Sequence, residues 1–518
     1  MIENFKLAKF NFKSIYFPAS KVKMGSSTRI NISIPSAVNE LGWGESFLAF
    51  VNSLTGPQIR GLLGDPFLDD LETQANKEHR SLSNLIISQL EAKYSSQGDI
   101  VDDTNNAVKK IVDKHKNIGV TFSDSLRKGL YGWYPYVEGF SANYARDAIL
   151  RNKKNIKNVY DPFGGSGTTQ LAAAQLGLAS YYSELNPFMN EVAKSKVISS
   201  AWVKENFEKF DKITDKFLRE INSDDFHLKS KSIDLSDYNQ AFPNRDFFKE
   251  EHIKQLLYAI NIASSLSQGQ EHIERILKVA CISNAVGCSN MTRRADLRRR
   301  RPDEYKNRIV NVSKAISSSI IIMRNDIIEM THSNPSSIFV NDDARKLPDE
   351  YNNFFDFVLT SPPYLNGTNY FRNTKIELWL SSFIKSENDL RAFRDKTVTG
   401  GINDVSKKNA YHKFDSVEKI ASMLDTCSTD KRIPTMVRHY FSDMYEVLTN
   451  IYNGLVDGGD LLLDIGDSKF YGVHVPTNSL LIDVAEKIGF EFISENVLAQ
   501  RLSRDKTKLV QVEILLRK

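Results

Sequence analysis

The sequence predicts an α/β fold, and two strand-like runs with distinctive ends support this class most strongly. Residues 158–169 read as a short strand followed by a glycine-rich turn, and residues 170–176 read as the start of a helix. That order is typical of a nucleotide-binding crossover, in which the helix N-terminus faces the ligand. A second apolar run, residues 355–360, stops at the sequence Ser-Pro-Pro-Tyr. Because ligands of α/β sheets bind at the carboxyl ends of strands, we expect both strand ends to contribute to one site.

The glycine turn distinguishes among three kinds of ligand. A P-loop would place a lysine after Gly167, where this chain has Thr168. A dinucleotide fingerprint would place a third glycine three residues after Gly167, where Gln170 stands. Neither phosphate-binding pattern is complete, so the acid at the strand end, Asp161, favours a cationic ligand such as S-adenosylmethionine. A second short strand ends at Glu184, near the interval of about 20 residues expected for a carboxylate on a ribose.

The corner at residues 361–364 is chemically suited to hold a flat ring that carries an amino group. Its two prolines fix φ and remove two backbone donors, so the preceding strand has to stop there. The corner then presents a hydroxyl from Ser361 on one side and the aromatic ring of Tyr364 on the other.

Both segments closely resemble the motifs of the DNA amino-methyltransferases, which methylate cytosine N4 or adenine N6 with S-adenosylmethionine. The cofactor motif corresponds to Asp-Pro-Phe-x-Gly-x-Gly-Thr-Thr at residues 161–169, and the catalytic motif to residues 361–364. The resemblance covers roughly residues 131–518. It implies a Rossmann-like, seven-stranded mixed sheet of the class I methyltransferase type, with inserted, largely helical DNA-recognition segments and an N-terminal extension.

The resemblance also implies a set of cofactor-binding residues: Asp161, Pro162, Phe163, Gly165, Gly167 and Thr168 at the methionine end, Glu184 on the ribose, Asn186 and Asp343 at the adenine, and Tyr136 and Ser141 from an additional motif before the glycine turn. Several of these residues have a plainer alternative. Asp342 is a near-equal candidate for the role of Asp343, and Asn186 fits a simple turn equally well. Ser141 could instead be only the N-cap of a helix that begins at Ala142.

The implied catalytic residues are Ser361, Pro362, Pro363 and Tyr364. Acceptors near Ser361 would draw on the hydrogens of the target amino group, while Tyr364 stacks on a base flipped out of double-stranded DNA. A serine at position 361 resembles the cytosine-N4 branch, although some adenine-N6 enzymes carry it too. Methylation of cytosine C5 points to a different family, which has a cysteine nucleophile directly after a proline. The three cysteines of this chain follow Ala, Gly and Thr, so C5 methylation is disfavoured.

The chain of 518 residues is long enough for several domains. Residues 1–125 read as an extension of unknown role and residues 126–200 as the first part of the core. Residues 201–335 read as an inserted helical domain, because a crossover needs only about a dozen residues. Residues 336–518 read as the second part of the core, with a further insert at about 366–440.

The first insert contains a cluster of six arginines, which predicts contact with DNA phosphates: Arg293, Arg294, Arg298, Arg299, Arg300 and Arg301. The alternative is a solvated helix face. Because the net charge is only +4, a nucleic-acid surface would have to be local.

Composition and termini limit the other possibilities. The sequence has no apolar run of 18 residues and no signal-peptide pattern, so we expect a cytoplasmic protein without a membrane partner. Three cysteines are too few for a disulfide framework and are wrongly spaced for zinc. The resemblance further implies a restriction–modification or other host-protection role, with a cognate restriction endonuclease acting on the same site. An RNA amino-methyltransferase and a non-catalytic DNA-binding protein are the remaining alternatives.

Overall fold

The chain divides into two compact units, residues 1–116 and 117–518, and the boundary falls close to the end of the expected N-terminal extension. In the first unit the described elements are the antiparallel strands β1 (Ala19–Met24) and β2 (Ser27–Ile32). The computed structural model describes residues 19–24, 27–32, 125, 129–136, 139–152, 156–293, 296–306, 308–330, 336–365, 370–405, 410–502 and 506–518.

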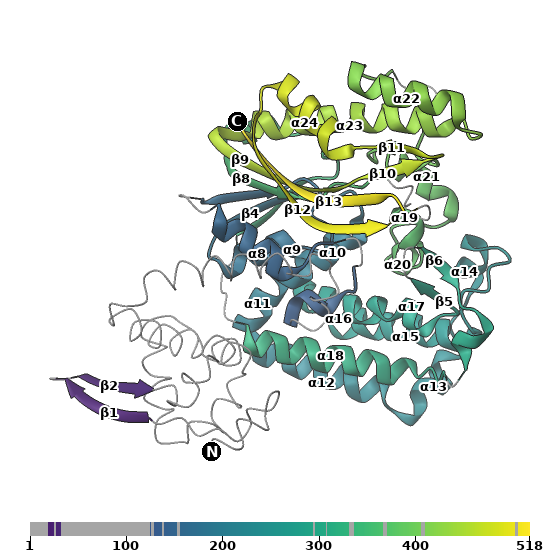
Figure 1. Cartoon of the computed structure of the whole chain (residues 1–518). Coiled ribbons are helices and arrows are strands. Elements are labelled where there is room, and N and C mark those ends of the chain that lie inside the picture. Colours follow the sequence, from purple (N-terminus) through teal and green to yellow (C-terminus); the bar gives the residue numbers. More distant parts are fainter. Residues whose placement is uncertain are drawn as a thin grey trace, which may run out of the picture. The chain divides into compact units, whose positions relative to one another are not determined.

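The second unit is built around a mixed seven-stranded sheet (Figure 1). Its strands are β3 (Asn158–Asp161), β4 (Ala179–Ser183), β7 (Ser337–Asn341), β8 (Phe355–Thr360), β9 (Leu455–Gly466), β12 (Glu491–Leu502) and β13 (Lys508–Arg517). They lie in the order β12-β13-β9-β8-β3-β4-β7, and β13 is antiparallel to both of its neighbours. The other four pairings are parallel. This is the Rossmann-like α/β sheet that the sequence predicted.

Helices cover both faces of the sheet (Figure 1). One face packs against α8 (Ala142–Arg151) and α9 (Thr168–Gln175), and the other packs against α22 (Asp415–Cys427), α23 (Arg432–Gly454) and α24 (Thr477–Ile488). The approach of α8 and α9 to the sheet is close because their inner positions are alanines. Ala145, Ala148 and Ala172 are fully buried beside Val159 and Leu359.

The first insert is largely helical, as expected. After α10 (Pro187–Lys194) it contains α11 (Ser200–Glu205), α12 (Phe207–Ile221), α13 (Asp224–Ser230), α14 (Ser236–Ala241), α15 (Glu250–Leu266), α16 (Glu271–Ser283), α17 (Ala285–Cys288) and α18 (Val312–Glu329). Its core includes Phe210, Leu256 and Ile276, and Phe188 of α10 belongs to the same cluster. The insert therefore packs onto the methyltransferase-like core through α10.

Of the clustered arginines, Arg293, Arg298 and Arg299 lie on the strands of a short hairpin, and Arg300 and Arg301 follow it, which corrects the alternative interpretation of a helix face. Strands β5 (Met291–Arg293) and β6 (Leu297–Arg299) pair in antiparallel fashion between α17 and α18. Each strand has three residues, which is too short for a periodic pattern to reveal in the sequence.

The second insert follows β8 and contains α19 (Tyr370–Asn373), α20 (Lys375–Leu380) and α21 (Leu390–Arg394) before α22. A small hairpin, β10 (Ser468–Phe470) and β11 (Val473–Val475), follows β9. The remaining short elements are η3 (Gly129–Trp133), η4 (Ser195–Ser199), η5 (Pro302–Tyr305), η6 (Asp349–Tyr351) and η7 (Glu387–Asp389).

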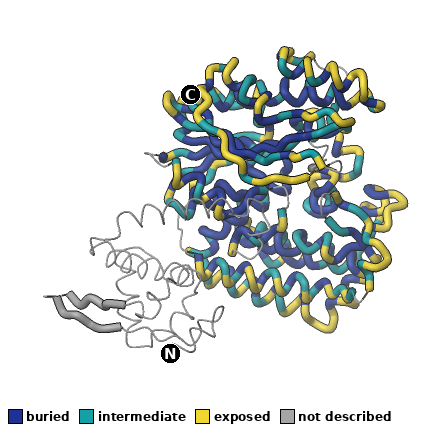
Figure 2. The backbone as a smooth tube through the Cα atoms, in the orientation of Figure 1, coloured by how far each residue is buried: buried dark blue, intermediate teal, exposed yellow. Residues whose placement is uncertain are grey.

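Buried residues lie along the sheet and the inner faces of the helices, whereas the edge strand β12 is exposed along most of its length (Figure 2). Within the described part of the chain, no helix combines the length and the apolar character needed to cross a bilayer.

Candidate active site

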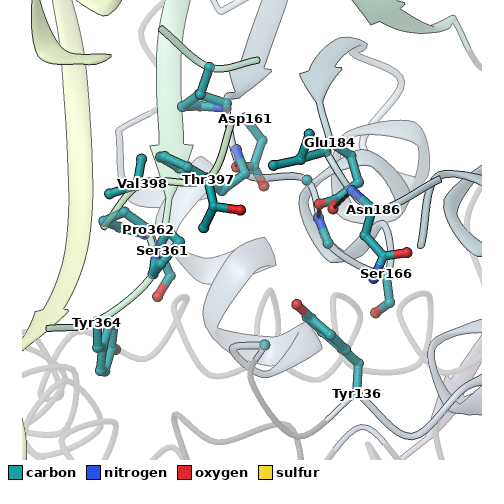
Figure 3. Close-up of a pocket in the computed structure, with 18 of the residues that line it drawn as sticks. Tyr136, Asp161, Ser166, Glu184, Asn186, Ser361, Pro362, Tyr364, Thr397 and Val398 are labelled. Atoms are coloured by element: carbon teal, nitrogen blue, oxygen red, sulfur yellow. Dashed lines mark hydrogen bonds between the residues drawn. The ribbon is translucent and has the colours of Figure 1, made fainter. Parts of the chain in front are cut away.

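A pocket of about 350 Å³ opens at the carboxyl ends of the parallel strands. It lies where the strand order reverses between β3 and β8, which is the position at which α/β sheets bind ligands. Figure 3 shows Glu184 and Asn186 on one side of the pocket and Ser361, Pro362 and Tyr364 on the other. Most of the residues predicted from the sequence line it: Tyr136, Asp161, Pro162, Phe163, Gly165, Thr168, Glu184, Asn186, Asp343, Ser361, Pro362, Pro363 and Tyr364.

Asp161, at the end of β3, connects the glycine turn to the neighbouring strand. Its carboxylate accepts hydrogen bonds from Oγ1 of Thr169 at 2.6 Å, Oγ1 of Thr360 at 2.7 Å and the backbone N–H of Phe163 at 3.0 Å. Burial raises the pKa of Asp161 to about 6, and these hydrogen bonds oppose that shift. The acid therefore fixes the turn, the start of α9 and the end of β8 relative to one another.

Glu184, at the end of β4, holds the other side of the turn. One carboxylate oxygen accepts the backbone N–H of Gly165 at 2.7 Å, and the other accepts the backbone N–H of Asn186 at 2.7 Å. Burial raises the pKa of Glu184 to about 7. Asn186 in turn caps α10 through its side-chain oxygen and donates its amide to Oγ1 of Thr374 at 2.8 Å, so its interpretation as a turn residue and its place in the pocket both hold.

Two of the three glycines of the turn have different roles. Gly165 has φ +51°, and a Cβ there would lie 3.0 Å from the Tyr136 ring, beside the pocket. Gly167 has φ +87°, and a Cβ there would lie 2.9 Å from Cα of Ala193. Gly167 therefore permits the close approach of α9 and α10 and does not line the pocket.

Ser141 likewise lies outside the pocket lining, contrary to its expected cofactor contact. Its buried hydroxyl caps α8 by accepting the backbone N–H of Tyr144 at 3.1 Å. The plainer interpretation of this serine as a helix cap is confirmed.

The two neighbouring acids after β7 differ in their environment. Asp343 is buried, and the Arg345 guanidinium donates to both of its oxygens, at 3.0 and 3.2 Å. Asp342 is exposed and pairs with Lys396 at 2.6 Å. Both acids line the pocket, and the ion pair with Arg345 holds Asp343 in one orientation.

The corner at residues 361–364 is held by two residues that the sequence did not single out for a role. The Tyr364 hydroxyl donates to Oδ1 of Asp464 at 3.0 Å, and the side-chain amide of Gln511 donates to both oxygens of Asp464, at 2.8 and 3.0 Å. Asp464 and Gln511 both line the pocket. An acid within the otherwise apolar run 461–465 was a signal for Asp464, whereas Gln511 gave none.

The second insert contributes part of the pocket wall through residues 396–398, which the sequence also did not identify. Thr399, next to them, donates from its backbone N–H and its hydroxyl to Oδ2 of Asp443 on α23, at 2.8 and 2.7 Å. Figure 3 shows Thr397 and Val398 on the same side of the pocket as Ser361 and Pro362. The hydrogen bonds of Thr399 fix the segment that carries them.

The six clustered arginines are not equivalent. Arg293 forms an ion pair with the buried Glu377, Arg298 pairs with Glu304 at 2.7 Å, and Arg299 pairs with Asp246 at 2.5 Å. Arg294 lies outside the described residues. Arg300 and Arg301 form no ion pair with any carboxylate of the described residues; Arg301 is exposed and Arg300 half-buried.

No family model matches the chain. Type II methyltransferase M.AvaI of a Nostoc species is 23% identical over 407 residues, which is 72% of this chain and 81% of the relative. Type II methyltransferase M.BsoBI of Geobacillus stearothermophilus is 22% identical over 465 residues, 80% and 86% of the two chains. Type II methyltransferase M.MvaI of Kocuria varians is 26% identical over 323 residues, 57% and 67% of the two chains.

Among solved structures, a SAM-dependent methyltransferase from Methanosarcina mazei aligns with 72% of this chain and 96% of its own, at 9% identity and a TM-score of 0.26. By sequence, the chain is related over most of its length to proteins named type II methyltransferases.

Proposed function

We propose that this protein is a DNA methyltransferase that transfers the methyl group of S-adenosylmethionine to an exocyclic amino group, with cytosine N4 as the preferred target. One observation carries the proposal. The glycine turn after β3 and the Ser-Pro-Pro-Tyr corner after β8 lie on adjacent parallel strands, joined by the hydrogen bond from Thr360 to Asp161. Two motifs far apart in the sequence therefore face one pocket.

The pocket has the chemistry expected for this cofactor. S-adenosylmethionine supplies an activated methyl group on a sulfonium centre. The lining includes the carboxyls of Asp161 and Asp464, which are buried, and of Glu184, which is half-buried, so it favours a cationic ligand. The buried Asp343 is already paired with Arg345. The lining also includes two basic residues, Lys396 and Arg501. Lys396 is paired with Asp342, and the Arg501 guanidinium donates to the backbone carbonyl of Asp467. The volume lies within the range of about 300–1,000 Å³ typical of small-molecule sites.

The corner at 361–364 suits the second substrate, a flipped base. The lone pair of an exocyclic amino nitrogen is delocalised into its ring, so the nitrogen attacks poorly. The Ser361 hydroxyl and the Pro362 carbonyl can accept the amino hydrogens, which favours a more tetrahedral nitrogen aligned with the methyl group. As the nitrogen bonds to the methyl carbon, the bond between that carbon and the sulfonium sulfur breaks and S-adenosylhomocysteine leaves. The nitrogen then loses one proton to water, and no covalent bond to the protein is needed.

The identity of the methylated base is the first expected result. Because position 361 is serine, DNA modified by this protein should contain N4-methylcytosine and neither N6-methyladenine nor C5-methylcytosine. Mass spectrometry of digested nucleosides measures this. Finding N6-methyladenine would be consistent with methyl transfer to an amino group but would contradict the assignment to cytosine N4. Methylated nucleosides found in RNA alone would favour the RNA amino-methyltransferase alternative.

Site specificity, as in a restriction–modification system, is tested in cells. A plasmid should be propagated in cells that express the chain, and its modified bases mapped by single-molecule sequencing. We expect modification at nearly every copy of one short sequence. Modified bases scattered over unrelated sequences would argue against a site-specific enzyme with a cognate endonuclease.

We propose that Arg300 and Arg301 at the β5–β6 hairpin contact DNA phosphates. Exchanging both for glutamine should weaken DNA binding and lower the slope of log affinity against log salt by up to about 2, since each contact accounts for about 0.9. Lys212→Gln is the control, because Lys212 lies on α12, exposed and paired with Glu208. A double variant with the parental slope would exclude these two arginines from the DNA surface.

A further inference from the structure

Arg501, near the carboxyl end of β12, belongs to the wall of the pocket. Strand pairing shows which face of the sheet its side chain occupies. Gln511 on β13 pairs with Gly466 of β9 on one side and with Ala499 of β12 on the other, so these three positions share one face. Arg501 follows Ala499 by two residues, and it therefore lies on the same face, one step nearer to the carboxyl edge of the sheet.

The Tyr364 ring occupies this face as well. It packs so closely on Gly466 that a Cβ there would lie 3.1 Å from the ring. Because this ring is the surface on which we expect the flipped base to stack, Arg501 lies beyond the base-holding end of the pocket. Its position is toward the carboxyl ends of the strands, where the pocket opens.

Arg501 is exposed, and its guanidinium is held in place. One nitrogen donates to the backbone carbonyl of Asp467 at 2.9 Å, whereas the Asp467 carboxylate pairs with His474 at 2.9 Å. Among the described residues no carboxylate forms an ion pair with Arg501, while Lys396, the other basic residue of the lining, is paired with Asp342. A guanidinium has five N–H donors, so the remaining donors of Arg501 can serve a ligand.

A group of this kind suits a phosphate. A guanidinium matches the geometry of phosphate oxygens and can bind two of them through parallel hydrogen bonds. A nucleotide that turns its base into the pocket keeps a phosphate on each side of its sugar, and these phosphates stay at the pocket entrance. The acids deeper in the lining would repel a phosphate, so the rim at Arg501 is the favourable place for it.

We infer that Arg501 binds a backbone phosphate next to the flipped nucleotide and thereby positions the target base against Tyr364. This inference rests on the proposed methyl transfer to DNA. It assigns a DNA contact to the core sheet, on a strand different from the β5–β6 hairpin of the first insert.

Arg501→Gln tests the inference in the full-length protein. We expect KM for plasmid DNA to rise by about 10-fold, as for the loss of one charge-assisted contact. The affinity for S-adenosylmethionine, measured by calorimetry, should not change. Arg517→Gln is the matched control, because Arg517 lies on the neighbouring strand β13 and pairs with Asp460 at the opposite end of the sheet. This control should keep the parental KM.

DNA with one uncharged backbone position locates the contact. Once the recognition sequence has been mapped, duplexes can be made with a methylphosphonate in place of the phosphate on the 5′ or the 3′ side of the target nucleotide. One of the two should raise KM of the parent by about 10-fold. The same duplex should have little further effect on Arg501→Gln, because both changes remove one and the same contact.

Two results would overturn the inference. One is a parental KM in Arg501→Gln. The other is a pair of methylphosphonate effects that both simply add to the effect of the substitution, since independent changes are additive. Absence of methyl transfer by the parent protein would instead overturn the proposed function.

Discussion

Gly165→Arg should abolish S-adenosylmethionine binding. Gly165 has φ +51°, where a side chain costs about 1–3 kcal/mol of backbone strain, and a Cβ would lie 3.0 Å from the Tyr136 ring. The arginine side chain would then extend into the pocket, next to the acids that we expect to bind the cofactor. Calorimetry with S-adenosylmethionine should show no measurable heat of binding at concentrations that saturate the parent.

Gly177→Arg is the matched control for this variant. Gly177 has φ +70°, and nothing lies within 4 Å of the position that a Cβ would take, so the substitution introduces the same kind of strain without blocking the pocket. We expect this control to lose thermal stability and to keep cofactor affinity. If Gly165→Arg bound S-adenosylmethionine with unchanged affinity, the cofactor could not bind at the glycine turn.

Tyr364→Ala should cost methyl transfer far more than cofactor binding. Base stacking on an aromatic side chain contributes about 1–3 kcal/mol, and alanine also removes the hydroxyl that donates to Asp464. kcat/KM for DNA should therefore fall by at least about 10- to 100-fold, measured as methyl incorporation into DNA under steady-state conditions.

Tyr364→Phe separates the two contributions. Phenylalanine retains the ring and loses only the hydrogen bond to Asp464, so its activity should lie between the parent and the alanine variant. A Tyr364→Ala enzyme that methylated DNA at the parental rate would place the base-holding surface elsewhere in the pocket.

Local sequence patterns predicted the parts of the fold that depend on short stretches of chain. The strand, glycine turn and helix at residues 158–175 appear as β3, the turn and α9 because glycines at positive φ and an alanine-rich helix specify that geometry locally. The acids Asp161 and Glu184 could be placed for the same reason, since each follows directly from a strand end.

The sequence could not predict contacts that depend on how distant strands pair. Asp464 and Gln511 meet because β9 and β13 are antiparallel neighbours, and Tyr364 reaches them from the end of β8. Nothing near Gln511 in the chain indicates this. The same limit applies to the arginine cluster, where Arg298 and Arg299 find carboxylate partners that lie in other segments or beyond the hairpin strand.

Ser141 shows a different limit, because one local pattern fitted two roles. A serine before an alanine-rich helix is a good N-cap and also matches a loose cofactor motif. Its hydroxyl accepts the N–H of Tyr144, and its neighbours Gly139 and Phe140 line the pocket in its place.

The most direct test of the central claim is methyl transfer by the purified full-length chain. The protein should be incubated with duplex DNA and S-adenosylmethionine that carries a deuterated methyl group, and the DNA digested to nucleosides for mass spectrometry. We predict that the deuterated methyl group will be found on an exocyclic amino nitrogen, as N4-methylcytosine. DNA without label, or label on cytosine C5, would contradict this claim.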